Sequence, residues 1–272
     1  MVHKNSVKSR LTYVHFAMRR VHSFFGLWLV LYLCEHLFVN AQAAGLLGGE
    51  GSYFIRWVNR LQALPYIHVL EVVMLAVPFV VHGVWGVCYA YQSRCNAYPM
   101  GGAVPSLPYR RNRAFTWQRL TAWFLIVAIL AHVVQMRWVA YPRRVNEQHY
   151  VVRLDRDARL MAVAAKIGAV VTERSPMHAR QVLVETSTIG AAFFLIVRDT
   201  FKNPLLVSLY SLFVLAAVYH ACNGLWTFLL TWGVVVKASL QSQMRVFTSI
   251  LMGLLSLLGL IACWGSYVRL VW

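Results

Sequence analysis

Charged side chains are scarce in this sequence, and acidic ones are the scarcest. Asp, Glu, Lys and Arg make up 13% of the 272 residues, against about 25% in an ordinary soluble domain. Only 9 residues are acidic, whereas 59% are hydrophobic. This balance excludes a disordered chain and most soluble enzymes, and it predicts an integral membrane protein.

Motifs for thiolate and nucleotide chemistry are also missing. The five cysteines show no CxxC spacing, which argues against a disulfide-stapled secreted module and against a thiolate metal site. They are Cys34, Cys88, Cys95, Cys222 and Cys263. The sequence contains no GxGxxG and no P-loop, so any flavin or nucleotide chemistry must belong to a partner.

Five apolar stretches are long enough to cross a bilayer, which takes about 20 helical residues. They cover roughly residues 21–40, 65–91, 115–139, 205–236 and 245–268. The first follows basic residues, as a signal peptide does, but it exceeds the usual apolar core of about 7–15 residues. We therefore expect a retained first helix, and an all-α membrane protein of five transmembrane helices forming a single domain over residues 1–272.

Basic residues predict the orientation of the chain. Three lie in the short segments on one side, namely Arg56, Arg60 and Arg269. Twelve lie on the other side: Lys4, Lys8, Arg10, Arg19, Arg20, Arg94, Arg110, Arg111, Arg113, Arg119, Lys237 and Arg245. The positive-inside rule then places the N terminus in the cytoplasm and the C terminus outside a cytoplasmic (inner) membrane. The same clustering accounts for the net charge of +17 without a nucleic-acid partner.

Residues 140–203 form the one large polar region, which we expect to be an external connection between the third and fourth helices. Within it, residues 157–171 are predicted to be helical and residues 181–186 to form a strand. Residues 189–197 are apolar but too few to span a membrane. We interpret the region as a folded external cap.

Histidine is the unusual residue of the apolar stretches. Six of the ten histidines lie there: His22, His36, His68, His82, His132 and His220. A histidine in hydrocarbon is costly and usually faces a partner inside the bundle. One such residue would suggest an interhelical hydrogen bond, but six on four helices suggest axial ligands of haem iron.

Depth along the helices sorts four of these histidines into two couples. At about 1.5 Å per residue, His36 and His132 both lie about 20 Å from the cytoplasmic edge. By the same measure His82 and His220 lie about 4–8 Å from that edge of a core about 30 Å thick. Two couples about 15 Å apart are what two stacked bis-histidine haems require, so the first four helices are predicted to form a haem-binding bundle.

Spacing alone leaves alternatives open. His22 and His68 lie 14 residues before His36 and His82 and on the same helix faces, so they compete for the two layers. Glycines follow three of the histidines after four residues, at Gly26, Gly86 and Gly224. A glycine there either clears space for a flat macrocycle or simply permits close helix packing.

Several short motifs together resemble the cytochrome b membrane subunit of the succinate dehydrogenase/fumarate reductase family, in its one-subunit, five-helix, two-haem form. They are Arg19-Arg20-Val21-His22-Ser23, Glu35-His36-Leu37-Phe38-Val39-Asn40, Leu64-Pro65, Val81-His82-Gly83-Val84-Trp85-Gly86-Val87, Gln118-Arg119 and His220-Ala221-Cys222-Asn223-Gly224-Leu225-Trp226. The resemblance covers nearly the whole chain except residues 143–188, which are longer than the family's connection.

The resemblance implies two haem b groups, one held by His36 and His132 and the other, nearer the cytoplasm, by His82 and His220. It leaves His22 and His68 as non-ligands, so that His22, Arg19 and Arg119 become candidates for binding haem propionates. It also implies a flavoprotein and an iron–sulfur subunit on the cytoplasmic side, and a membrane quinone, most often menaquinone in the five-helix form.

Glu71 is the one acid well inside a predicted span. An intramembrane carboxylate is a functional candidate by default. We hypothesise that Glu71 handles protons for the quinone, the alternative being a hydrogen bond to His68 or to a neighbouring helix.

Two other functions stay open at this point. A di-haem anchor of a hydrogenase or formate dehydrogenase would have the same histidine depths. A transporter whose histidines relay protons is a different class, but the sequence lacks the broken-helix pair and inverted repeat typical of one.

Overall fold

The structure, a computed structural model, describes residues 2–45, 49–93, 96–98, 105–146, 149–174 and 180–271, without side chains for residues 2–12, 173, 174 and 271. Arg94 and Cys95 therefore lie outside the described residues, as do the side chains of Lys4, Lys8 and Arg10. Among the described residues, five helices are long and apolar enough to cross a membrane: Tyr13–Ala44, Ile67–Gln92, Arg110–Val139, Pro204–Thr231 and Ala238–Leu270. This confirms the predicted helical membrane protein.

The first span is formed by α1 (Val2–Ala41), which continues into the short 3-10 helix η1 (Gln42–Ala44). α8 (Pro204–Thr231) forms the fourth span. The other three spans each contain a π-helical segment: η3 (Val72–Ala76) between α3 (Ile67–Glu71) and α4 (Val77–Gln92), η4 (Val134–Val139) after α5 (Arg110–Val133), and η5 (Ile261–Gly265) between α9 (Ala238–Leu260) and α10 (Ser266–Val271). A π-helical turn interrupts the regular hydrogen bonding of a helix and is frequent near functional sites.

The chain forms two compact units, each built from three segments of the sequence. Unit 1 consists of Met1–Leu33, His68–Ile126 and Ala217–Met252. Unit 2 consists of Cys34–Ile67, Val127–Ala216 and Gly253–Trp272.

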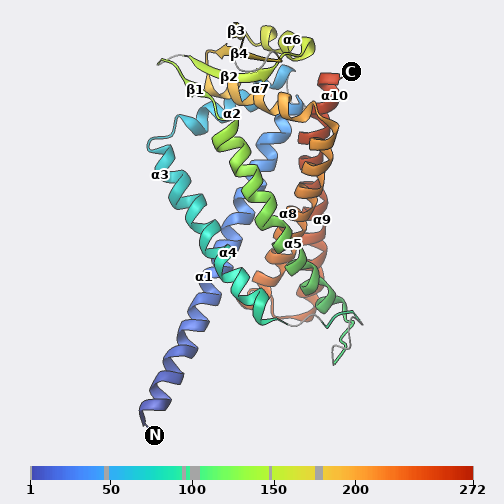
Figure 1. The fold of residues 1–272 in the computed structure, drawn as a ribbon. Coiled ribbons are helices and arrows are strands. Elements are labelled where there is room, and N and C mark those ends of the chain that lie inside the picture. Colours follow the sequence, from blue (N-terminus) through green and yellow to red (C-terminus); the bar gives the residue numbers. More distant parts are fainter. Residues whose placement is uncertain are drawn as a thin grey trace. The chain divides into compact units, whose positions relative to one another are not determined.

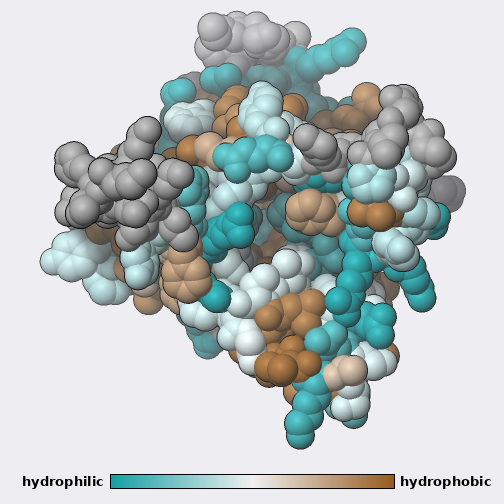
Figure 2. All heavy atoms as spheres, turned by 90° about the horizontal axis from the view of Figure 1, so that it is seen from below, coloured by the Kyte–Doolittle hydropathy of each residue, from teal (hydrophilic) through white to brown (hydrophobic). Residues whose placement is uncertain are grey.

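Tryptophan and arginine side chains tie the helices of unit 1 together. Trp28 of α1 donates from Nε1 to the carbonyl oxygen of Met74 in η3, at 2.5 Å. Trp232 donates to Oγ of Ser23 at 3.1 Å, and Arg20 donates to the carbonyl oxygen of Thr231 at 2.6 Å. Figure 2 views the molecule from below, and on this face hydrophilic side chains are interspersed with hydrophobic ones.

The fourth span ends earlier than the predicted residue 236. α8 stops at Thr231, and Gly233 has a left-handed φ of 70°. The amides of Gly233 and Val234 bond back to the carbonyls of Leu230 and Leu229, which satisfies the end of the helix. The apolar residues after Gly233 therefore lie outside the helix.

In unit 2, the long connection forms a four-stranded antiparallel sheet of order β1-β2-β4-β3 (Figure 1). The strands are β1 (Arg143–Arg144), β2 (Tyr150–Asp155), β3 (Val170–Arg174) and β4 (Gln181–Thr186). Tyr150 pairs with Thr186 and Asp155 with Gln181. The valine and leucine residues of one face are buried: Val152, Leu154, Val182 and Val184.

The buried face of the sheet packs on α7 (Ile189–Phe201), whose contacts are with β2 and β4. α7 also packs against α2 (Ser52–Gln62), which follows the 3-10 helix η2 (Gly49–Gly51), and against α6 (Ala158–Lys166). At the α2–α7 contact, the rings of Phe54 and Phe194 lie 6.3 Å apart. A Cβ at Gly190 would collide with the carbonyl oxygen of Ile55, so glycine permits this close approach.

The structure bears on three predictions for this region. Residues 181–186 are a strand, as predicted, and the apolar run at residue 189 is part of the non-spanning helix α7. The predicted helix at residues 157–171 is partly wrong, because α6 ends at Lys166 and Val170 and Val171 belong to β3. Gly168 has a φ of 75°, which ends the helix and redirects the chain into the strand. The connection is therefore not all helical.

Arg198 of α7 is buried and holds three parts of unit 2 together. Its guanidinium donates to the carbonyl oxygens of Ser266 in α10 and Ala43 in η1, both at 2.9 Å. Burial, and then the nearby charge of Arg269, lower the pKa of Arg198 to about 10. The side chain therefore stays charged at neutral pH, and its role is to link the cap to the ends of the first and fifth spans.

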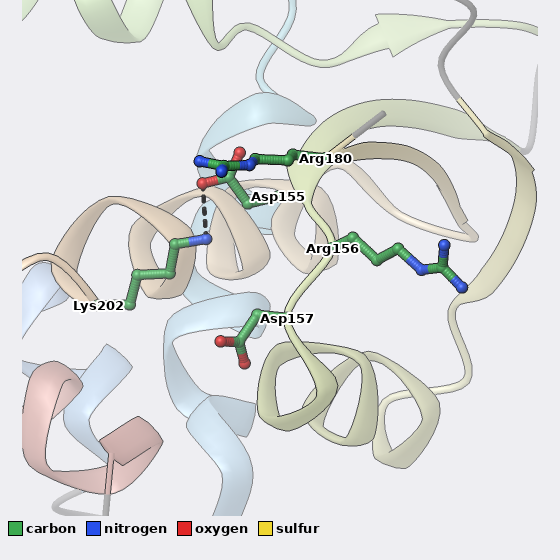
Figure 3. A pocket seen from close by; sticks show the side chains of 5 residues that line it. All are labelled: Asp155, Arg156, Asp157, Arg180 and Lys202. Carbon is green, nitrogen blue, oxygen red and sulfur yellow. Dashed lines mark ion pairs between the residues drawn. The ribbon is translucent and has the colours of Figure 1, made fainter. Parts of the chain in front are cut away.

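A polar cavity of about 410 Å³ lies at the end of β2 and is lined by Asp155, Arg156, Asp157, Arg180 and Lys202 (Figure 3). Lys202 pairs with Asp155 at 2.8 Å and with Asp199 at 2.7 Å. Burial opposes the charge of Lys202, but these two carboxylates outweigh it and raise the pKa of Lys202 above its usual value. Because Lys202 is paired with two carboxylates, we assign this cavity a structural role.

Candidate functional site

Two of the predicted ligand histidines meet in unit 2. His36 of α1 and His132 of α5 are half-buried, and their ring centres lie 6.0 Å apart with the ring planes at 81°. Two different spans therefore present one imidazole each, with the two ring planes almost perpendicular.

A tyrosine from a third helix orients His132. The hydroxyl of Tyr210 in α8 lies 3.2 Å from Nδ1 of His132 and donates its own proton to Oε1 of Gln135, at 2.9 Å. Tyr210 must then accept a hydrogen bond from Nδ1–H of His132. The other ring nitrogen, Nε2, is left with its lone pair free to bind a metal.

Unit 1 contains the second couple. The ring centres of His82 in α4 and His220 in α8 lie 6.3 Å apart, with the ring planes at 84°. Nδ1 of His82 lies 3.0 Å from the carbonyl oxygen of His22, and Nδ1 of His220 lies 3.2 Å from that of Gln118. A carbonyl oxygen only accepts, so both Nδ1 atoms carry the proton and both Nε2 atoms can bind a metal.

His22 lies directly against this couple. Its ring stacks on that of His82, with the centres 4.1 Å apart and the planes at 8°. Nδ1 of His22 donates to the carbonyl oxygen of His82 at 3.0 Å. Each of the two histidines therefore donates from its ring to the backbone carbonyl of the other, which links α1 and α4 by two reciprocal hydrogen bonds. The structure thus brings three predicted residues together in unit 1: His22, His82 and His220.

The ring separations test whether these couples fit haem iron. A metal–imidazole bond is about 2 Å long and a ring nitrogen lies about 1 Å from its ring centre, so two axial imidazoles have centres about 6 Å apart. The couples His36–His132 and His82–His220 match that distance, whereas the His22–His82 stack is too close to enclose an ion. Across the described ranges, no group of three or more His, Cys, Asp and Glu is arranged to hold a metal ion. Haem iron, whose macrocycle supplies the other four ligands, needs only such a couple.

The predicted glycines lie beside side chains of the opposite helix. A Cβ at Gly26 would lie 2.9 Å from Cε1 of His82, and one at Gly86 would lie 3.5 Å from Cε1 of His22. Gly224 faces Gln118 instead, with 3.5 Å from its Cβ position to Nε2. Gly26 thus makes room for the imidazole of His82 across the helix contact, whereas a Cβ at Gly86 or Gly224 would make an ordinary contact.

Gln118 is a residue to which the sequence motifs assigned no role. It donates from Nε2 to the carbonyl oxygen of His220 at 3.0 Å and accepts from Asn223 at 2.8 Å. The backbone carbonyl of Gln118 also accepts from Nδ1 of His220, so Gln118 contacts both the ring and the backbone of that histidine. Its presence beside Arg119 in a recognised motif was the only signal available in the sequence.

The predicted propionate-binding arginines lie close to aromatic rings of unit 1. The guanidinium carbon of Arg19 is 5.7 Å from the ring centre of Tyr89, and that of Arg119 is 4.5 Å from the ring centre of Phe115. Arg119 also donates to Oγ1 of Thr116 at 3.4 Å. These contacts leave the propionate role of both arginines a prediction.

Glu71 makes the contact that we considered as the alternative to a proton role. Its Oε2 lies 3.3 Å from Nδ1 of His68, one turn earlier on α3, and the side chain of His68 is 68% exposed. Neither residue belongs to the two histidine couples. The π-helical segment η3 follows Glu71 directly, so the carboxylate lies at an irregular point of its span.

The chain is similar to a known cytochrome b subunit. The chain is 27% identical, over 246 residues, to the succinate dehydrogenase cytochrome b558 subunit of Bacillus subtilis (strain 168); the match covers 90% of this chain and 94% of that protein. No family model and no solved structure matches. The similarity confirms the predicted resemblance to the cytochrome b anchor subunits of succinate dehydrogenase.

Proposed function

We propose that this chain is the cytochrome b membrane subunit of a succinate:quinone oxidoreductase and carries electrons through two b haems. The observation that carries the proposal is the pair of histidine couples, each drawn from two different spans, with ring centres 6.0 and 6.3 Å apart and ring planes nearly perpendicular. The similarity to a cytochrome b558 subunit supports the same assignment.

Bound haem b would supply one-electron redox chemistry, and this chain would supply its ligands and surroundings. His36 and His132 would hold one iron, and His82 and His220 the other. The Nδ1–H group of His132 donates to Tyr210, and that of His220 donates to the carbonyl of Gln118. These hydrogen bonds keep each ring in position and increase electron donation from Nε2.

The distribution of basic residues supports a cytoplasmic N terminus and an external C terminus in the cytoplasmic membrane. With that orientation, residue spacing along the spans puts His82 and His220 on the cytoplasmic side. The flavoprotein and iron–sulfur partners would dock there, and His36 and His132 would serve the step farther from them.

A membrane quinone, for which we propose menaquinone, would exchange electrons with the haem at His36 and His132. We further propose that Glu71 transfers protons for that quinone. Replacing Glu71 with glutamine should then lower quinone turnover about tenfold or more, because a positioned acid or base typically contributes at least that factor. The measurement is quinone-dependent turnover from pH 5 to 9.

Glu35→Gln provides the matched control, because Glu35 is also a carboxylate within a span. Its turnover should equal that of the wild type. Unchanged turnover and an unchanged pH profile in Glu71→Gln would leave only the hydrogen bond to His68 as the role of Glu71.

The donor can be identified with the purified complex. We expect flavin and iron–sulfur subunits to co-purify with the chain. Succinate added under anaerobic conditions should reduce both haems, as followed by the absorption spectrum. Reduction by hydrogen or formate, with no response to succinate, would assign the chain to another respiratory complex. A haem-free protein would instead favour a transporter.

A further inference from the structure

One buried hydroxyl of unit 1 belongs to Tyr89, on α4. Less than 1 Å² of its oxygen is accessible, and it has no hydrogen-bond partner among the described residues. Two other tyrosine hydroxyls of the spans have partners: Tyr210 bonds to Gln135 and Tyr219 to the carbonyl oxygen of Ala114. Because a buried hydroxyl without a partner is destabilising, this one calls for an acceptor.

The surroundings of Tyr89 indicate what that acceptor is. Its ring meets the ring of His22 edge-on, with centres 5.6 Å apart and planes at 83°, and the guanidinium of Arg19 lies 5.7 Å from its ring centre. A hydroxyl donor on a ring that a guanidinium faces suits a negatively charged group. A carboxylate in an apolar span needs donors of this kind.

The position of Tyr89 on its helix links it to the haem ligand. It follows His82 by seven residues, which is 20° short of two helical turns, so both lie on the same face of α4. The rise over seven residues is about 10 Å, and it leads toward the end of the span that carries Arg19 on the neighbouring helix. Tyr89 therefore shares a helix face with the candidate ligand His82 and lies toward the end of the span that carries Arg19.

We propose that the hydroxyl of Tyr89 donates a hydrogen bond to a propionate carboxylate of the haem held by His82 and His220, beside the positive charge of Arg19. The inference rests on the proposed function. It makes Tyr89 a positioning residue that also tunes the redox potential of this haem, a role that no sequence motif indicated.

The electrostatic consequence has a definite sign. A propionate carries negative charge, which stabilises oxidised haem relative to reduced haem. A hydrogen-bond donor spreads that charge, so the hydroxyl raises the midpoint potential. Removing the hydroxyl in Tyr89→Phe should therefore lower the potential of the haem at His82 and His220.

The test is an anaerobic potentiometric titration of the purified complex, with the two haems resolved by their spectra. At the wild-type midpoint, Tyr89→Phe should lower the ratio of reduced to oxidised haem about threefold, which is a shift of about 30 mV at 59 mV per tenfold for one electron. The haem at His36 and His132 should not move. Tyr89→Gln, which keeps a donor, should recover part of the shift.

Tyr91→Phe is the matched control, since Tyr91 lies one half-turn away on α4 and is 78% exposed. Its titration should match the wild type. A fully haem-loaded Tyr89→Phe that titrates like the wild type would overturn the inference, as would equal shifts in Tyr89→Phe and Tyr91→Phe. A wild-type protein without haem would instead overturn the proposed function.

Discussion

Replacing His132 with alanine should reduce the haem content of the purified protein from two groups per chain to one. The substitution removes one of the two imidazoles of the couple, and His36 alone would not hold the haem. His36→Ala should give the same loss. Haem is counted by the pyridine haemochrome assay against protein concentration, and the lost spectral component should be identical in the two variants.

His149→Ala is the control for this experiment, because His149 belongs to unit 2 but bonds Asn146 in the polar connection. It should retain both haems. If His132→Ala and His36→Ala keep two haems, or if they lose different spectral components, the two residues do not share one iron.

The second large effect separates His82 from His22. His82→Ala and His220→Ala should each lose the other haem, whereas His22→Ala should retain both. The reason is geometric: His82 faces His220 at 6.3 Å, the separation that suits an iron between two imidazoles, while His22 stacks on His82 at 4.1 Å. Haem counting and reduced-minus-oxidised spectra of the three variants provide the measurement.

His68→Ala extends the comparison, since His68 bonds Glu71 and takes no part in either couple. It should also retain both haems. Loss of haem from His22→Ala together with full retention in His82→Ala would reverse the assignment and make His22 the ligand opposite His220.

Pattern and spacing predicted the parts of this molecule that depend on neighbouring residues in the chain. Length and hydropathy are sufficient to predict five spans, because apolar helices of that length match the thickness of a bilayer. The depth of a histidine follows from helical rise, so spacing allowed the couples His36–His132 and His82–His220. Spacing did not exclude His22 and His68, and only the family resemblance chose between these alternatives. The strand at Gln181–Thr186 was equally local.

What the sequence could not predict depends on contacts between distant segments. Tyr210 lies 78 residues from His132, and no spacing rule connects them. The stacking of His22 on His82 could not be predicted, because helix periodicity shows which face of a helix a residue occupies but not the angle at which two helices cross. The three π-helical segments were missed for a related reason, since one inserted residue in a helix leaves no signal in an apolar run.

Hydropathy and helix propensity also predicted two helix ends wrongly, at positions where a glycine ends the helix. Gly233 ends the fourth span although the apolar run continues beyond it, and Gly168 ends α6 before the predicted boundary. Both have φ near 70°, a conformation that glycine adopts freely. A stop at these glycines would have been the better prediction.

Low-temperature electron paramagnetic resonance of the oxidised, purified protein examines the coordination directly. Two imidazoles on one ferric ion give a low-spin centre, and rings crossed at 81° and 84° should make both centres strongly anisotropic, with a largest g value well above that of haems with parallel rings. Two such signals integrating to two haems per chain are expected. A high-spin signal, a single centre or no haem signal would contradict the account.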